Sequence, residues 1–197
     1  MDGVGAIILA AGGSSRFGKP KQLLVFEGES LVRRAVRAAT EAGCHPVTVV
    51  VGDAGDQIQT ELRQTAAVVV ENLQWKRGLG TSIRSGLRYL LRLTPELEAV
   101  ILLACDQPFV DKGIITSLNR QRTNSGKSIV GSSYANTLGI PALFERAWFD
   151  SLLALPDYSG AKAFIESKSI HVTQIEFPQG VIDIDTPGDF ERLQTGL

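Results

Sequence analysis

The sequence predicts an α/β protein with a mostly parallel sheet, and three features of the chain support this prediction. Short apolar runs at residues 4–9, 47–51 and 100–104 are rich in the aliphatic and β-branched residues typical of buried strands. Segments with apolar residues at helical spacing, at 31–39 and 83–91, separate these runs. Each run ends in glycine, other small residues or a polar residue, as strands do where loops begin. Strands that alternate with helices form parallel sheets covered on both faces, so we predict a three-layer, Rossmann-like, doubly wound fold.

The whole chain, residues 1–197, is predicted to form a single domain. A chain of 197 residues is long enough for one well-packed core and short for two. It contains no internal repeat or low-complexity segment, and the polar stretch at 123–127, expected as a loop, is too short to divide domains.

Charge and composition exclude several classes of protein. The formal net charge of −1 gives no basic excess for nucleic acid. The apolar runs are far shorter than the ~20 residues that span a bilayer, and no basic segment of a secretory signal stands at the start. We therefore expect a cytoplasmic protein that binds neither nucleic acid nor membrane. Two cysteines and two histidines form no disulfide framework or zinc site, so any metal should be a hard cation bound by oxygen.

The other elements are predicted from local signals. Ser30 and Gly43 are expected to cap the helix at 31–39, and Pro46 and Gly52 bound the strand at 47–51. Later predictions are a helix near 56–64, a strand at 67–70, a helix with the apolar face Ile83, Leu87, Leu90 and Leu91, and a strand at 181–185.

The stretch after the first strand is the main candidate for a binding site. Its small side chains would let successive backbone N–H groups converge on a phosphate. Arg16 would add a planar fork and Lys21 a mobile point charge. The alternative is an ordinary strand-to-loop turn with surface cations, and the pattern is neither a Walker loop nor G-x-G-x-x-G. The candidate loop residues are Leu9, Ala10, Ala11, Gly12, Gly13 and Ser14.

Three later stretches should meet this loop at the carboxyl edge of the sheet. The first, residues 72–82, places small residues before a helix and could approach a ligand, or could be a connecting loop with a packed Trp75. In the second, Asp106 at the tip of an apolar strand is a natural Mg²⁺ ligand, although such residues are often helix caps, a role open to Asp111. Cys105 should face away from Asp106 and be packed rather than act as a nucleophile.

The third stretch carries Asp183 and Asp185. On a strand at 181–185 both carboxylates would share one face, where they repel unless a cation or water separates them. The alternative is a solvated strand end followed by a helix with Pro187 in its first turn.

Residues 9–21 fit Leu-Ala-Ala-Gly-x-Ser-x-Arg-x-Gly-x-x-Lys in full. In this motif the chain resembles the molybdopterin cytidylyl- and guanylyltransferases, within the superfamily of nucleotide-sugar pyrophosphorylases. The tetrad Cys-Asp-Gln-Pro at 105–108 and Asp-x-Asp-Thr-Pro at 183–187 support the resemblance. It implies a nucleotide-diphospho-sugar transferase-like fold and Mg²⁺ as cofactor. It also implies that Asp106 and Asp185 are metal ligands, that Asp183 is a substitute or water-mediated neighbour, and that Gly80 and Ser82 lie on the base side.

A further resemblance concerns the acceptor side. Gly139-Ile-Pro and the stretch at 157–162 are similar to family segments that would make Gly139, Asp157, Gly160 and Lys162 acceptor-binding residues. Pro156 stands where the family usually has glycine, and Lys162 replaces an arginine fork by a point charge. These departures leave the identity of the acceptor open.

The resemblance implies Mg²⁺-dependent transfer of CMP from CTP to molybdopterin, giving the cytosine dinucleotide and pyrophosphate. The catalytic residues would be Arg16, Lys21 and Asp106, with the loop and Arg16 on the β- and γ-phosphates and Lys21 on the α-phosphate. Leu-Ala-Ala-Gly, in place of Leu-Ala-Gly-Gly, favours CTP over GTP. Open alternatives are guanylyl transfer, nucleotidyl transfer to a sugar or polyol phosphate, and a non-catalytic molybdenum-cofactor carrier. A molybdenum hydroxylase is a further candidate as a transient partner.

Overall fold

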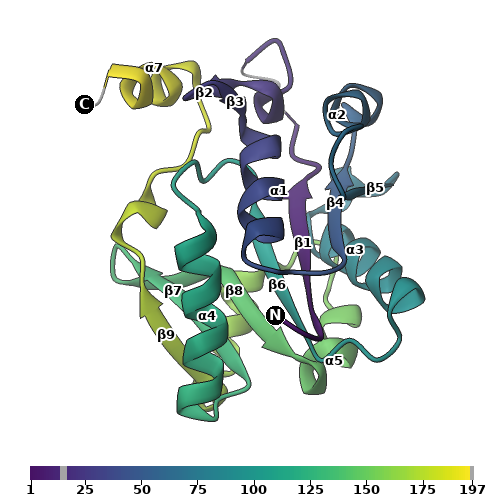
Figure 1. The fold of residues 1–197 in the computed structure, drawn as a ribbon, viewed down its shortest axis with the longest axis vertical. Helices are drawn as coiled ribbons and strands as arrows, with labels where there is room; N and C mark the ends of the chain where they lie inside the picture. Colours follow the sequence, from purple (N-terminus) through teal and green to yellow (C-terminus); the bar gives the residue numbers. More distant parts are fainter. Residues whose placement is uncertain (14–16, 196–197) are drawn as a thin grey trace.

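A computed structural model describes residues 1–13 and 17–195 of the chain, and a seven-stranded sheet forms its centre (Figure 1). The strand order is β5-β4-β1-β6-β8-β7-β9. The strands are β1 (Val4–Ala10), β4 (Val47–Val51), β5 (Val68–Glu71), β6 (Ala99–Ala104), β7 (Ile129–Tyr134), β8 (Thr137–Glu145) and β9 (Val172–Glu176). A separate short hairpin consists of β2 (Val25–Phe26) and β3 (Glu29–Ser30).

The sheet is mostly parallel, as predicted. Strands β5, β4, β1 and β6 are parallel to one another, and β9 is parallel to β7. Strand β8 runs antiparallel to both β6 and β7 and is inserted between them. The loops at the carboxyl ends of β1, β4 and β6 therefore meet at one edge.

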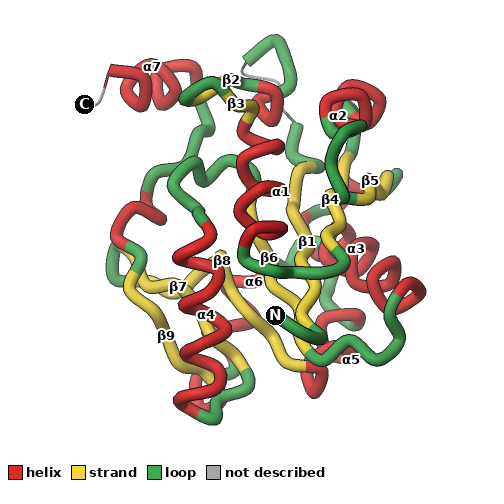
Figure 2. The backbone as a smooth tube through the Cα atoms, viewed as in Figure 1, coloured by secondary structure: helices red, strands yellow, loops and turns green. Residues whose placement is uncertain are grey.

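Helices cover both faces of the sheet (Figures 1 and 2). Helices α1 and α4 lie on one face, and α3, α5 and α6 pack on the other. The helices are α1 (Leu31–Glu41), α2 (Gly55–Glu61), α3 (Leu79–Leu93), α4 (Lys112–Ser125), α5 (Phe149–Leu153), α6 (Ala161–Ser167) and α7 (Pro187–Thr195). Short 3₁₀ segments are η1 (Lys21–Leu23), η2 (Trp75–Arg77), η3 (Arg146–Trp148), η4 (Ser169–His171) and η5 (Pro178–Val181). None of the helices in the described ranges has the length and apolar character needed to cross a membrane.

Strand β1 shows why the central strands are apolar throughout. Ala6 and Ile8 point into the core beneath α1 and α4, whereas Ile7 and Leu9 point into the core beneath α3. All four side chains are buried, because alternate residues of a strand face opposite sides of the sheet. The three-layer prediction is therefore confirmed.

The predicted helix caps form. The Ser30 hydroxyl accepts a hydrogen bond from the Arg33 amide (3.3 Å) at the start of α1. The Asp111 carboxylate accepts one from the Ile114 amide (2.9 Å) at the start of α4. Gly126, with φ +64°, ends α4 in the left-handed conformation that glycine adopts readily.

Two local predictions are wrong. The loop expected at 123–127 begins later, because α4 continues through Ser125. The segment 181–185 is not a strand: η5 ends at Val181, and residues 182–185 belong to none of the strands found in the described part of the chain. A backbone hydrogen bond from the Ile184 amide to the Asp106 carbonyl (3.1 Å) attaches this segment to the loop that follows β6.

Candidate active site

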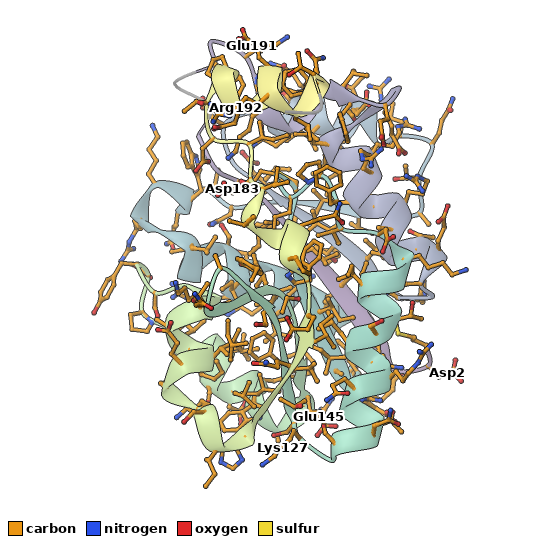
Figure 3. All side chains as sticks on the ribbon, turned by 90° about the vertical axis from the view of Figure 1, so that its left-hand side faces the viewer. Asp2, Lys127, Glu145, Asp183, Glu191 and Arg192 are labelled. Atoms are coloured by element: carbon orange, nitrogen blue, oxygen red, sulfur yellow. The ribbon has the colours of Figure 1, made fainter. Side chains whose placement is uncertain are left out.

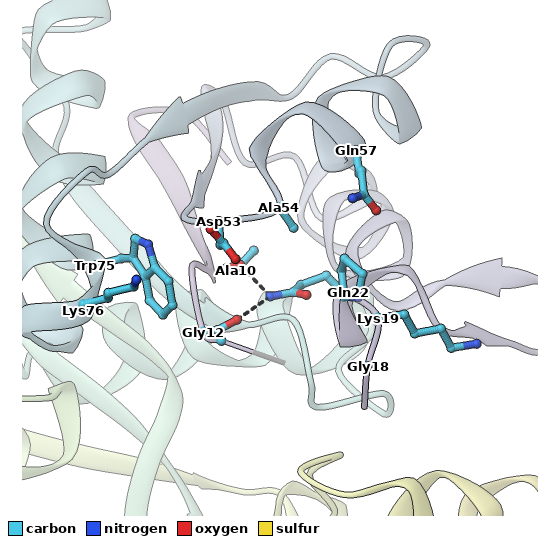
Figure 4. Close-up of a pocket in the computed structure, with 12 residues that line it drawn as sticks. Ala10, Gly12, Gly18, Lys19, Gln22, Asp53, Ala54, Gln57, Trp75 and Lys76 are labelled. Carbon is cyan, nitrogen blue, oxygen red and sulfur yellow. Dashed lines mark hydrogen bonds between the residues drawn. The ribbon is translucent and has the colours of Figure 1, made fainter. Parts of the chain in front are cut away.

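The small-residue loop after β1 is held by the side chain of Gln22. Its amide nitrogen donates to the carbonyl oxygens of Ala10 (2.8 Å) and Gly12 (2.9 Å), as Figure 4 shows. Gln22 is only 2% exposed. The two bonds fix the carbonyl groups on both sides of Ala11, which orients the adjoining backbone of the loop. Ser14 and Arg16, also predicted for this site, lie outside the described residues.

Two cavities adjoin the loop. One of about 450 Å³ is lined by the loop, η1, α2 and Trp75 (Figure 4). A second of about 250 Å³ lies between the loop, η1, the end of β6 and the start of α3. Trp75 borders both, and a Cβ atom on Gly52 would come within 2.7 Å of its ring. The second cavity is lined by Leu9, Ala11, Gly12, Lys21, Gln22, Trp75, Leu79, Ser82, Ala104, Cys105, Asp106 and Ile140.

Lys21 joins the two carboxylates that were predicted as metal ligands. Its Nζ lies 2.7 Å from Asp106 Oδ2 and 2.8 Å from Asp185 Oδ1. Partial burial alone would lower the pKa of Lys21, but the charges and hydrogen bonds of Asp106 and Asp185 outweigh it and raise that pKa. The ammonium group is therefore fully charged at neutral pH.

Asp183 belongs to the same acidic group. It lies on the segment that leads from η5 to α7, shown in Figure 3. Although the Asp183 side chain is exposed, desolvation by the surrounding residues, and then the negative charges of Asp185 and Asp106, raise the pKa of Asp183. Asp183 therefore adds negative charge near the ion pairs of Lys21 with Asp106 and Asp185.

The pair Asp106 and Asp185 fits a hard divalent cation. Within residues 1–13 and 17–195, no three acidic, histidine or cysteine side chains form a ready-made metal site. Mg²⁺ is commonly held by one or two carboxylates, with water and substrate phosphates completing its coordination. The ammonium group of Lys21 already bridges both carboxylates, so their geometry accommodates a positive charge between them.

Cys105 is packed, as predicted. It is buried, and burial raises the pKa of its thiol far above neutral pH, so the thiolate form is disfavoured. Its sulfur is therefore not poised as a nucleophile.

The two base-side candidates lie in different surroundings. Ser82 lines the second cavity, and its hydroxyl accepts a hydrogen bond from Asn72 Nδ2 (3.0 Å). Gly80 instead packs beneath the loop that follows α5, and its amide donates to the Asp157 carbonyl (2.9 Å). A Cβ atom on Gly80 would collide with the Pro156 carbonyl oxygen. The close approach at Gly80 is thus explained by packing within the chain.

The four acceptor-side candidates do not line either cavity described above. Asp157 forms ion pairs with Arg77 (2.5 Å) and Arg84. The hydrogen bond from Arg84, and then the charges of both arginines, lower the pKa of Asp157. Gly139 lies against the Tyr134 hydroxyl, Gly160 precedes α6, and Lys162 is exposed on that helix. The acceptor role of these residues stays a prediction.

The sequence did not assign roles to Gln22 or Gln107. Gln107 is buried and donates to two carbonyl groups, as Gln22 does. Gln22 directly follows Lys21, and Gln107 directly follows Asp106. This position next to a predicted site residue was the only hint of a role that the sequence offered for either glutamine. A polar side chain gives no periodicity that would reveal such bonds.

Comparisons with known proteins identify the family of this chain. The MobA-like NTP transferase domain family matches residues 6–172. The molybdenum cofactor cytidylyltransferase of Escherichia coli K12 is 24% identical over 191 residues, which cover 96% of this chain and 95% of that protein. A bifunctional IPC transferase and DIPP synthase of Rubrobacter xylanophilus is 38% identical over 95 residues, 45% of this chain. This match spans only 22% of the longer Rubrobacter protein.

Solved structures share the fold of this chain. Rv0371c of Mycobacterium tuberculosis H37Rv superposes with a TM-score of 0.81 and 28% identity, covering 98% of this chain and 97% of that one. A second structure of Rv0371c, a complex with manganese, gives a TM-score of 0.78 with 26% identity over 98% of this chain and 99% of that one. The family match covers most of the chain, so the chain belongs to the MobA-like NTP transferase family of nucleotidyltransferase enzymes.

Proposed function

We propose that the chain transfers CMP from CTP to molybdopterin in a Mg²⁺-dependent reaction. The observation that carries this proposal is the bridge from Lys21 to Asp106 and Asp185, beside a loop of small residues at the carboxyl edge of the sheet. A loop of this kind binds phosphates, and the charged group beside it suits phosphoryl chemistry.

In this proposal the residues position the reactants and stabilise charge. The backbone amides of Gly12 and Gly13, with Ser14 and Arg16, hold the β- and γ-phosphates. A terminal phosphate oxygen of the acceptor attacks the α-phosphorus. The bond from the α-phosphorus to the bridging oxygen breaks, and pyrophosphate leaves with that electron pair. Lys21 neutralises the charge that develops on the α-phosphoryl oxygens.

Asp106 and Asp185 would hold Mg²⁺, with Asp183 as a neighbour that increases the local negative charge. The bound cation would supply Lewis-acid polarisation of phosphate oxygens and a fixed orientation for them. The manganese complex of Rv0371c supports a divalent cation in this family. Two carboxylates with further oxygen ligands support Mg²⁺ as the cation.

The preference for CTP rests on Ala11, the motif residue beside the second cavity. Ala11 is almost fully buried and lines that cavity of about 250 Å³, where its methyl group occupies space that glycine would leave open. Similarity to the E. coli cytidylyltransferase over nearly the whole chain also supports CTP.

The alternatives are GTP as donor, a sugar or polyol phosphate as acceptor, and a non-catalytic carrier of molybdenum cofactor. The proposed setting is the cytoplasm, where a transient contact with a molybdenum hydroxylase would receive the product.

The test is pyrophosphate release with Mg²⁺ and molybdopterin, comparing CTP, GTP, ATP and UTP, with sugar and polyol phosphates as parallel acceptors. Release with CTP and molybdopterin alone is the expected result. Release with GTP would refute the preference for CTP. Release only with a sugar or polyol phosphate would refute molybdopterin as the acceptor. No release from any pair would refute the enzyme assignment and favour the carrier.

A further inference from the structure

Asp106 and Asp185 come from distant parts of the chain, so something must hold them together. Asp106 follows β6, in the middle of the sheet, whereas Asp185 lies on an extended segment outside it. The Asp185 side chain is 55% exposed. The backbone bond from Ile184 to Asp106 is one attachment of this segment.

Gln107 provides a second attachment, directly beside Asp106. Its Nε2 donates to the Ile140 carbonyl on β8 (3.2 Å) and to the Gly180 carbonyl in η5 (3.1 Å). A primary amide has two N–H groups, and both are used here. The side chain therefore ties η5, which leads directly into the acidic segment, to a central strand.

Burying the polar side chain of Gln107 costs stability, which indicates that the two hydrogen bonds donated by its Nε2 are important. Gln107 is only 8% exposed, and its Oε1 is buried without a hydrogen-bond partner among the described residues. The nearby Tyr134 hydroxyl donates to the Ile140 carbonyl (3.1 Å). An unsatisfied buried oxygen is unfavourable, and an apolar side chain of the same size would avoid it.

We propose that Gln107 is a positioning residue that holds the segment carrying Asp183 and Asp185 against Asp106. It acts through Asp185, and so sets the affinity of the two carboxylates for a divalent cation. This inference rests on the metal site of the proposed function.

The experiment measures Mn²⁺ binding to the full chain without nucleotide, by electron paramagnetic resonance of the free ion. Gln107→Met has nearly the same size and removes both donor groups and the unsatisfied oxygen. We expect the Kd for Mn²⁺ to rise about tenfold, the effect of losing hydrogen bonds worth about 1.4 kcal/mol. Ser132→Ala is the matched control, because it removes a buried hydrogen bond to the Pro141 carbonyl (2.6 Å) between β7 and β8. The control should leave the Kd unchanged, even where it lowers the melting temperature.

A double-mutant cycle separates positioning from a general loss of structure. Asp185→Asn alone should weaken Mn²⁺ binding, and Gln107→Met should add little to that loss, since it acts through Asp185. Equal losses in both backgrounds, or a folded Gln107→Met variant with an unchanged Kd, would overturn the role of Gln107. No Mn²⁺ binding by the unaltered chain would refute the metal site itself. Gln107→Asn, too short to reach both carbonyls, replaces Gln107→Met if that variant does not fold.

Discussion

Replacement of Lys21 by methionine should strengthen metal binding while it weakens catalysis. The ammonium group lies 2.7 and 2.8 Å from the two carboxylates, in the space that a shared cation needs. A divalent cation must therefore displace Lys21 from at least one of them. In Lys21→Met the cation meets two carboxylates with no competing charge.

The size of the effect follows from how deeply the ion pairs are buried. The side chains of Lys21, Asp106 and Asp185 are 11%, 23% and 55% exposed. Exposed ion pairs contribute up to about 1 kcal/mol, and breaking buried ones costs about 3–5 kcal/mol. Because one carboxylate is half exposed, we take the cost of displacing Lys21 from its ion pairs as about 1.5 kcal/mol. Removing this cost corresponds to roughly a tenfold lower Kd for Mn²⁺.

Mn²⁺ titration of the nucleotide-free chain measures the affinity, and pyrophosphate release measures the loss of turnover. Lys19→Met is the matched control, because it removes an exposed positive charge two residues away. A Kd in Lys21→Met that is unchanged or higher than in the unaltered chain would show that Lys21 and the cation do not compete. An equal gain of Mn²⁺ affinity in Lys19→Met would show that the effect comes from the change in net charge and not from the ion pairs of Lys21.

Three further predictions concern other parts of the site. Asp106→Ala should abolish pyrophosphate release while the circular dichroism spectrum stays native, and turnover near that of the unaltered chain would contradict its metal role. Gly80→Ala should lower the free energy of unfolding by about 1–3 kcal/mol in urea titrations, because the added methyl collides with the Pro156 carbonyl; equal stability would show that this loop moves freely. Asp157→Asn should lower the melting temperature at pH 7. The lowered pKa of Asp157 means that its ion pairs stabilise the fold above the ordinary value of 3.8, and that this contribution is lost as the pH falls through the lower, folded-state pKa. The difference from the unaltered chain should therefore shrink in acid, and a constant difference would contradict this origin.

The central strands could be predicted because burial on both faces leaves a direct mark on the sequence. Strands β1, β4 and β6 are continuous apolar runs for this reason. The segment 181–185 has the same alternation of polar and apolar residues as a half-buried strand, with Ile184 buried between two exposed aspartates. Alternation reports which side chains are buried, but not whether neighbouring backbone groups pair, so this prediction failed.

The acidic residues of the candidate site were predictable one by one, but their contacts were not. The bonds of Lys21 span 85 residues to Asp106 and 164 residues to Asp185, and no local spacing reports such separations. For the same reason, the glycine at position 80 indicated a close approach without showing that its partner is the Pro156 carbonyl.

The long separation between Lys21 and Asp185 also bears on the order of assembly during folding. Gln22 lies only about a dozen residues from the loop after β1, so its hydrogen bond to that loop can form early. The two carboxylates come together only when the segment after η5 docks, which closes a far longer loop. On the proposed function, a newly made chain can hold a divalent cation between Asp106 and Asp185 only after this segment has docked.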